Sequence, residues 1–260
     1  METMNDGIHY DYHDAMTRNA PLTIVLGGRG IGKTYAYKML SMTRPYSTLH
    51  LSRQDKESAR VANGYLKDLP QSMQMQFNLQ RKTILDDGEV QLKNPTVYKT
   101  LVDKDGVEKI QFTSLNVQNK GIPFEGTNQV IFDEFLIAEG SSVRYMKNEV
   151  TLFYDLLQTI MRNKKKFRVI MIANLIDWNN PYFAHWGIEK IDFSRRFTWI
   201  KKPDILLECP PNNPEWMKEY NESAFKRIVD GTQYDQYMQG GMPLINYDIQ
   251  VKRRPPMAIY

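Results

Sequence analysis

The segment from Gly27 to Thr34, GGRGIGKT, constrains this chain more than any other part of its sequence. It follows the apolar run PLTIVL at 21–26, which predicts a buried strand, and it leads into a predicted helix at 33–43. The segment matches the pattern G-x-x-x-x-G-K-[ST], in which a glycine-rich turn wraps its backbone N–H groups around phosphate oxygens. The positive end of the helix dipole strengthens this attraction. We therefore predict a nucleotide phosphate site between a strand and a helix.

The last two residues of this loop have individual roles in the pattern. Lys33 is placed to reach the β- and γ-phosphates, and the Thr34 hydroxyl is placed to bind Mg²⁺ beside them. A glycine-rich turn that precedes a helix by chance is the alternative, and the strand before the loop argues against it. We expect ATP and Mg²⁺ as ligands of the whole loop, which comprises Gly27, Gly28, Arg29, Gly30, Ile31, Gly32, Lys33 and Thr34.

A second apolar run, Val130–Phe132, ends in two acidic residues, Asp133 and Glu134. From the carboxyl end of a buried strand, Asp133 can reach the Mg²⁺ ion beside Thr34. Glu134 would then face the γ-phosphate, where its carboxylate can polarise the attacking water. In isolation this pattern is more typical of a strand that enters a solvated loop. Together with the phosphate loop, it predicts a metal ligand and a general base.

Asn174 directly follows a third apolar run, FRVIMIA at 167–173. Ligands of open parallel sheets lie at the carboxyl ends of strands, so this amide is a candidate to hold the attacking water or to contact the γ-phosphate. The alternative is that Asn174 caps the segment that follows. Many GTPases read their base with the motif N-K-x-D, whereas residues 119–122 read Asn-Lys-Gly-Ile. This difference favours ATP over GTP.

Several basic residues are candidates for contacts with anions. Arg162 ends a helical pattern at 145–163, where it could enter the site of a neighbouring subunit or simply complement the helix dipole in solvent. From the residues alone, the solvated helix end is the preferred interpretation. Arg53, Lys56 and Arg60 follow the second predicted strand and are candidate contacts to DNA, although such charges are more often a solvated surface.

Buried strands that alternate with helical patterns predict the fold class. We expect an α/β P-loop NTPase fold, with a mostly parallel sheet and helices on both faces. The stretch 81–112 places two Asp-Gly turns between alternating runs, which indicates an antiparallel hairpin insertion. The predicted core strands are 21–26, 46–52, 128–133 and 167–173, with a fifth within 190–200.

A proline-rich stretch at 201–216 interrupts this alternation. We therefore place an ATPase domain at 1–200 and a linker or lid segment at 201–260, with a helix at about 214–229. No run of about 18 apolar residues is present, so we predict no membrane span. The polar, acidic N-terminus lacks the features of a signal peptide, and the single cysteine, Cys209, favours a reducing compartment. We expect a cytoplasmic protein.

The motifs assembled above resemble the genome-packaging ATPases, or encapsidation proteins, of small tailed phages with protein-primed linear DNA. These proteins are related to the large terminases. The resemblance covers most of 20–235, and its motifs are specific in combination, order and spacing. They are GGRGIGKTYAYK, VIFDEF, KNEVTLFYDLLQTIMRNKKKFRVIMIAN with NPYF downstream, and FKRIVDGTQY at 225–234.

The resemblance implies a motor that uses ATP to move double-stranded DNA into an empty capsid in the infected bacterial cytoplasm. It implies a ring of five copies on the portal, and it leaves open an RNA adaptor between portal and motor. Arg162 matches the finger arginine of the family, which reverses the preference stated above, and Lys120 matches a second basic residue at the subunit interface. Arg29 matches the arginine within the family's phosphate loop, where it would act in its own subunit.

The sequence departs from the family in two places. The cluster after Arg162 is rich in lysine, which lacks the planar fork of arginine, so a second finger at Lys164 is not expected. Family members tend to carry a C-terminal nuclease-like domain, but 249–260 resemble at most its first strand, and no cluster of metal-binding acids follows residue 235. Either the sequence is a form truncated before a nuclease-like domain or that domain is absent, and in both cases we expect no nuclease activity from this sequence.

Two other classes of function remain as alternatives. A P-loop kinase that acts on a small metabolite would use Lys120 and Arg162 within one subunit as a lid. A non-catalytic, nucleotide-gated assembly factor would need the phosphate loop but not the water-activating Glu134.

Overall fold

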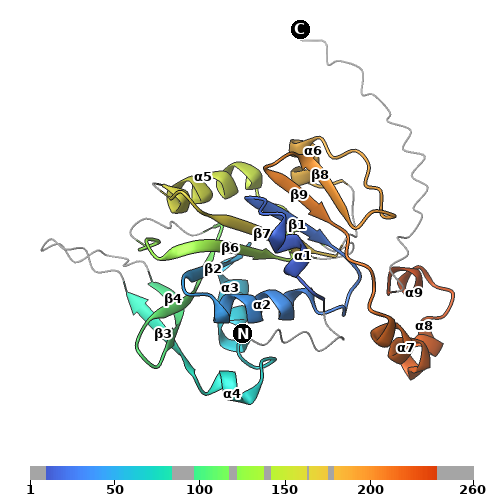
Figure 1. Ribbon diagram of the computed structural model, residues 1–260, viewed down its shortest axis with the longest axis horizontal. Helices are drawn as coiled ribbons and strands as arrows, with labels where there is room; N and C mark the ends of the chain where they lie inside the picture. The colour runs from blue at the N-terminus through green and yellow to red at the C-terminus, as the bar shows by residue number, and fades with distance from the viewer. Residues whose placement is uncertain are drawn as a thin grey trace, which may run out of the picture.

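The computed structural model describes residues 10–83, 97–116, 122–137, 142–162, 164–174 and 179–238, and nine strands of this part form one sheet (Figure 1). Their order is β3-β4-β5-β2-β6-β7-β1-β9-β8. Six neighbouring strands, β5, β2, β6, β7, β1 and β9, run parallel to one another. Antiparallel strands extend the sheet at both edges, with β4 and β3 beside β5 and with β8 beside β9. This arrangement confirms the predicted mostly parallel sheet. The strands are β1 (Leu22–Leu26), β2 (Ser47–Ser52), β3 (Phe77–Thr83), β4 (Val97–Asp103), β5 (Glu108–Ser114), β6 (Thr127–Asp133), β7 (Arg168–Ala173), β8 (Phe197–Lys201) and β9 (Ile205–Glu208).

Helices cover both faces of the sheet, as predicted, because successive side chains of a strand point to opposite faces. Along β7, Val169 and Met171 pack in the core beneath α5, whereas Ile170 and Ile172 pack beneath α2. Figure 1 shows α5 on one side of the central strands and α2 with α3 on the other. The helices are α1 (His13–Thr17), α2 (Lys33–Thr43), α3 (Asp55–Gly64), α4 (Gln71–Gln74), α5 (Glu149–Met161), α6 (Pro181–Trp186), α7 (Pro214–Glu222), α8 (Ala224–Val229) and α9 (Gln233–Met238).

The strand order brings the three predicted functional motifs to one edge of the sheet. β7 lies between β1 and β6, and in this register Leu26 pairs with Ala173 while Asp133 pairs with Ile172. All three strands are parallel, so their carboxyl ends meet. The phosphate loop after β1, the acidic pair at the end of β6 and the residue after β7 are therefore neighbours in space.

The predicted antiparallel insertion continues the main sheet. Its second Asp-Gly turn joins β4 to β5, and Gly106 adopts the left-handed conformation that this turn needs, with φ of 77°. β5 also pairs in parallel with β2, so the insertion is attached along a full strand. The first predicted turn, around Asp87-Gly88, lies outside the described residues.

The sheet extends past residue 200, where the sequence suggested that the ATPase domain ends. β8 and β9 form a hairpin across this position, and β9 pairs in parallel with the loop-bearing strand β1. The helix expected at 214–229 is two helices, because the chain turns at Ser223, whose hydroxyl accepts a hydrogen bond from Lys226 N and caps α8. Within the described residues, no helix has the length and apolar character needed to cross a membrane.

Candidate nucleotide site

The loop between β1 and α2 has the left-handed backbone that its glycines permit. Gly30 has φ of 88° and Gly32 has φ of 84°, a region that side chains with a Cβ atom rarely adopt. Lys33 is the first residue of α2, so the helix begins directly after the turn. The unpaired N–H groups of the first helical turn and the positive end of the helix dipole therefore face the space enclosed by the loop.

Lys33 is buried against this loop and against the end of β7. Its ammonium group donates hydrogen bonds to Gly27 O at 3.0 Å, Gly28 O at 2.7 Å and Asn174 Oδ1 at 2.9 Å. Burial lowers the pKa of Lys33 to about 8, and the nearby charge of Asp133 opposes that shift. Lys33 thus lies between the loop and Asn174, where incoming phosphate oxygens can replace the carbonyl acceptors.

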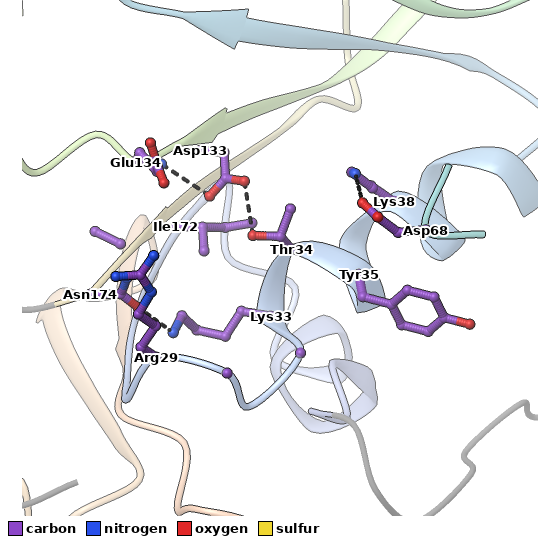
Figure 2. A pocket seen from close by; sticks show the side chains of 13 residues that line it. Arg29, Lys33, Thr34, Tyr35, Lys38, Asp68, Asp133, Glu134, Ile172 and Asn174 are labelled. Atoms are coloured by element: carbon purple, nitrogen blue, oxygen red, sulfur yellow. Dashed lines mark hydrogen bonds and ion pairs between the residues drawn. The ribbon is translucent and has the colours of Figure 1, made fainter. Parts of the chain in front are cut away.

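The Thr34 hydroxyl donates a hydrogen bond to Asp133 Oδ2 at 2.9 Å and so joins the start of α2 to the end of β6 (Figure 2). Burial raises the pKa of Asp133 to about 6, the Thr34 hydrogen bond opposes this shift, and the neighbouring charge of Glu134 adds to it. A hydroxyl and a carboxylate at this separation are the oxygen ligands that Mg²⁺ takes beside a nucleotide. Thr34 and Asp133 therefore fit a magnesium site.

Glu134 has a left-handed backbone, with φ of 52°, which is uncommon for a residue with a side chain. Its N–H donates to Asp133 Oδ1 at 3.0 Å, and its carbonyl accepts from Arg53 Nη1 at 3.4 Å. These contacts hold the backbone on both sides of the residue, while the exposed carboxylate faces the same cavity as Asp133. Such a group can accept a proton from water beside a bound phosphate.

A cavity of about 590 Å³ unites these groups, which come from four separate parts of the sequence. Its size suits a bound small molecule. Figure 2 shows the basic loop residues and the acidic pair on opposite sides of it. Its lining consists of Arg29, Gly30, Gly32, Lys33, Thr34, Tyr35, Lys38, Asp68, Asp133, Glu134, Ile172, Ala173 and Asn174.

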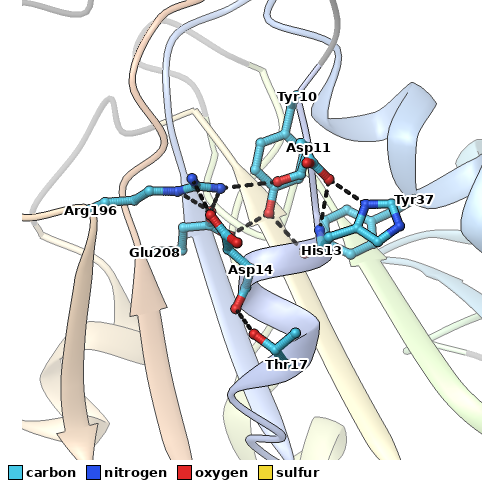
Figure 3. A network of polar contacts seen from close by, with 8 residues as sticks. All are labelled: Tyr10, Asp11, His13, Asp14, Thr17, Tyr37, Arg196 and Glu208. Atoms are coloured by element: carbon cyan, nitrogen blue, oxygen red, sulfur yellow. Dashed lines mark hydrogen bonds and ion pairs between the residues drawn. The ribbon is translucent and has the colours of Figure 1, made fainter. Parts of the chain in front are cut away.

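The chain before β1 braces the loop from outside (Figure 3). Tyr10 N donates to Ile31 O at 2.8 Å, and the Tyr10 hydroxyl donates to the buried carboxylate of Glu208 at the end of β9. The same hydroxyl lies 3.1 Å from the hydroxyl of Tyr37 on α2, and Arg196 Nε donates to Glu208 at 3.0 Å. This network ties the loop, α2 and the β8–β9 hairpin together.

Comparison with known proteins assigns the family. The family described as Podovirus DNA encapsidation protein (Gp16) matches residues 4–249, nearly the whole chain. This chain belongs to the Podovirus DNA encapsidation (Gp16) family. The resemblance inferred from the motifs is therefore confirmed.

Proteins of Bacillus phage phi29 are among those similar to this chain. The phi29 DNA packaging protein is 28% identical over 239 residues, which are 90% of this chain and 65% of the relative. The N-terminal domain of the phi29 DNA packaging ATPase has the same fold, with a TM-score of 0.59 and 24% identity over 79% of this chain and 97% of that domain. A chain of the phi29 viral genome packaging motor assembly aligns with a TM-score of 0.60 and 25% identity, over 87% of this chain and 64% of that one. This chain thus spans somewhat less than two thirds of the phi29 relative's length.

Arg53, which the sequence suggested as a DNA contact, is buried in this Gp16 family member. Its guanidinium group is 3.0 Å from the Glu149 carboxylate and donates to Phe135 O at 2.6 Å. Because the Arg53 side chain is buried in these contacts, the expectation that it contacts DNA is corrected. Its partner lies 96 positions away and could not be identified from the local sequence. Lys56 and Arg60 of α3 are exposed and stay candidates for DNA contact.

Arg162 lies far from the nucleotide site of its own chain. It directly follows α5, and the nearby Lys164 ammonium group contacts the carbonyls of Phe124 and Thr127, where β6 begins. Asp133 ends the same strand, so Arg162 is at the opposite edge of the sheet. Lys164 thus contacts backbone carbonyls of its own chain. Lys120 lies outside the described residues.

The sequence analysis missed several residues around the site. Lys38 lies one helical turn after Thr34 and therefore faces the same cavity, and Asp68 forms an ion pair with it at 3.0 Å. The i, i+4 spacing from Thr34 is a signal that could have identified Lys38. Trp216 packs against Gly30 from outside the loop, and no local pattern indicates this contact.

Proposed function

We propose that this protein is the ATP-hydrolysing subunit of a motor that moves double-stranded viral DNA into a procapsid. The observation that carries the proposal is the convergence of Lys33, Thr34, Asp133 and Glu134 on one cavity in a member of the encapsidation family. The names of the relatives refer to DNA packaging and to a packaging motor assembly, which supports a motor rather than the P-loop kinase considered above.

The residues of the cavity suit the hydrolysis of a nucleoside triphosphate. The loop amides and the Lys33 ammonium group would bind the β- and γ-phosphates, and Thr34 with Asp133 would hold Mg²⁺, which neutralises charge on the phosphates when bound. The Glu134 carboxylate would accept a proton from the attacking water as its oxygen bonds to the γ-phosphorus. The bond between that phosphorus and the β–γ bridging oxygen breaks, and ADP and inorganic phosphate result.

Asn174 lies between the phosphate loop and the acidic pair. Its side-chain oxygen accepts the Lys33 hydrogen bond, and it follows β7, the strand between the loop strand and the acidic strand. From there the amide can orient the attacking water or sense whether the γ-phosphate is present. We therefore retain it as a positioning residue of the site.

We propose that Arg162 and Lys120 act on the site of a neighbouring copy. The position of Arg162 at the opposite edge of the sheet from Asp133 supports an action in trans, because the residue is remote from the cavity of its own chain. An arginine supplied in trans requires head-to-tail packing of subunits in a ring. We propose that five copies form a ring on the portal, with or without an RNA adaptor. This assembly would act in the cytoplasm of the infected bacterium.

The test is the ATPase rate as a function of protein concentration, with and without double-stranded DNA. A motor that shares its sites between subunits should hydrolyse ATP faster as subunits associate and when DNA is added. A rate per subunit that depends on neither variable would contradict the motor and favour the kinase alternative.

A mixing experiment tests the shared site directly. Glu134→Gln protein lacks the base, and Arg162→Ala protein lacks the finger, so each alone should be inactive. In mixed rings, some interfaces combine an intact Glu134 with an intact Arg162, and activity should reappear. If the mixture stays as inactive as its components while both proteins assemble, Arg162 does not act in trans.

A further inference from the structure

The order of the strands determines which side of the phosphate loop receives the nucleoside. The acidic strand β6 lies on one side of β1, beyond β7, and β9 lies on the other. Thr34 contacts Asp133 on the β6 side, and this contact directs the γ-phosphate end of a bound nucleotide toward Glu134. A nucleotide is an extended molecule, so we place its ribose and base on the opposite side, toward the end of β9.

The chain that follows β9 lies directly on the loop at this side. A Cβ atom added to Gly27 would lie 3.1 Å from Pro210 Cγ, and one added to Gly28 would lie 3.0 Å from Asn212 Oδ1. At the tip of the loop, a Cβ atom on Gly30 would lie 3.0 Å from the Trp216 ring. Pro210, Asn212 and Trp216 therefore lie against the loop, in the segment that follows β9.

Trp216 in the first turn of α7 is the large flat side chain of this segment. It is half-buried, and its ring stacks on that of Tyr220 with centroids 5.4 Å apart and planes inclined by 5°. The indole atoms nearest to Gly30 are Cζ2, Cε2 and Nε1. Among the described residues, Tyr220 is the aromatic ring that packs on Trp216, and it occupies one face of the indole.

The ring beneath Trp216 is held in place by the two helices that follow. Tyr220 is buried, and its hydroxyl donates to Asp235 Oδ1 at 3.0 Å. Asp235 in α9 also accepts from Lys226 of α8 at 3.0 Å. The Trp216–Tyr220 stack is thus supported by hydrogen bonds from α7, α8 and α9, which limits the conformational freedom that a stacking ligand would have to remove.

We propose that Trp216 is the stacking platform for the base of the nucleotide that binds at the Gly27–Thr34 loop. The inference rests on the proposed nucleotide site and adds to it the residue that recognises the nucleoside. Stacking uses the π-face of the base and reads no hydrogen-bond pattern, so it favours bases with larger rings without fixing one of them. Purine nucleotides should therefore bind more tightly than pyrimidine nucleotides, and the loss of Trp216 should reduce that difference.

The experiment compares a ligand that has a base with one that has none. Isothermal titration of the whole protein with Mg-ATP and with magnesium tripolyphosphate measures the two dissociation constants separately. For Trp216→Ala, we expect the Mg-ATP dissociation constant to rise about tenfold and that of tripolyphosphate to stay unchanged. Trp216→Phe keeps an aromatic face and should recover most of the Mg-ATP affinity.

Phe225 in the next helix, α8, provides a control. It is an exposed aromatic residue of α8 that packs edge-on against Tyr234, so Phe225→Ala removes a comparable ring away from the loop. We expect both dissociation constants to be unchanged in this variant. If Trp216→Ala weakens both ligands equally, or weakens neither, then Trp216 only packs against the loop and the platform does not exist.

Lys33→Ala separates a failure of this inference from a failure of the nucleotide site itself. At a true phosphate loop, this variant loses affinity for both Mg-ATP and tripolyphosphate. If it does so while Trp216→Ala binds both ligands normally, the platform alone is refuted. If Lys33→Ala binds both ligands normally, the assignment of the loop fails, and the assignment of Trp216 fails with it.

Discussion

Arg53 Nε lies 3.0 Å from both carboxylate oxygens of Glu149, and the two side chains are only 4% and 0% exposed. The same guanidinium group donates to the backbone carbonyls of Glu134 and Phe135. The Tyr182 hydroxyl also donates to Glu149 Oε1, at 2.9 Å. This buried ion pair therefore joins the end of β2 and the start of α5 to the backbone that carries the proposed general base.

Removal of Arg53 should destabilise the protein strongly. Arg53→Ala leaves the Glu149 carboxylate buried without its cation, and breaking a buried pair in this way costs about 3–5 kcal/mol. Urea denaturation followed by circular dichroism should show that loss in the free energy of unfolding. The double variant Arg53→Met with Glu149→Leu removes both charges. Its loss in the free energy of unfolding should be clearly smaller than the sum of the losses in Arg53→Met alone and Glu149→Leu alone. Additive losses would contradict the coupling.

Thr34→Val should impair the binding of nucleotide with Mg²⁺ specifically. The substitution keeps the size of the side chain but removes the hydroxyl that contacts Asp133. We expect Mg-ATP affinity to fall about tenfold or more, whereas ATP affinity measured in EDTA should change little. Thr43→Val, near the end of the same helix, serves as the control, because its hydroxyl donates to the backbone carbonyls of Met39 and Leu40. An equal loss with and without Mg²⁺ would exclude Thr34 as a metal ligand.

Asn174→Ala should slow turnover more than it weakens binding. The variant removes the amide oxygen that accepts from Lys33, but it leaves the loop and its other contacts in place. We expect kcat to fall by about a hundredfold with little change in KM, since the amide would act on the reacting water or the γ-phosphate. Asn63→Ala removes an exposed amide that accepts from Lys99 and should leave the rate unchanged. A normal kcat in Asn174→Ala would show that the residue merely caps the following segment.

Tyr10→Phe should destabilise the protein without removing the brace from the loop. The Tyr10 hydroxyl bonds to the buried Glu208, whereas the contact to Ile31 uses the backbone and survives the substitution. Loss of one hydrogen bond to a buried carboxylate should cost about 1–3 kcal/mol, visible as a lower thermal midpoint. Tyr12→Phe provides the control, because no hydrogen bond of the Tyr12 hydroxyl is among those that the structure describes. Equal midpoints for Tyr10→Phe and the wild type would refute this role.

Local patterns were sufficient to predict the strands and helices that carry the site. The phosphate loop, the acidic pair and Asn174 each follow a buried apolar run, and parallel strands bring their carboxyl ends together whatever the rest of the chain does. The helix predicted at 33–43 is α2, with the same bounds. Periodicity and glycine placement act over a few residues, so they can be recognised in a single sequence.

Features that depend on long-range pairing were not predictable in this way. Arg53 looked like a surface charge because its partner, Glu149, is distant in sequence. The predicted boundary at residue 200 divides a hairpin because the four residues of β9 pair with β1, which lies far before them in the sequence. The contact of Trp216 with Gly30 is equally non-local. Burial and strand pairing, rather than residue type, decide the roles of these residues.

The most direct test of the account compares ATP hydrolysis by the wild type, Lys33→Ala and Glu134→Gln, together with nucleotide binding by each. The account predicts that Lys33→Ala loses both binding and hydrolysis. It predicts that Glu134→Gln retains Mg-ATP binding while its turnover falls by a factor of about a hundred or more. Hydrolysis at the wild-type rate by both variants would contradict the assignment of phosphate binding to the loop and of water activation to the acidic pair.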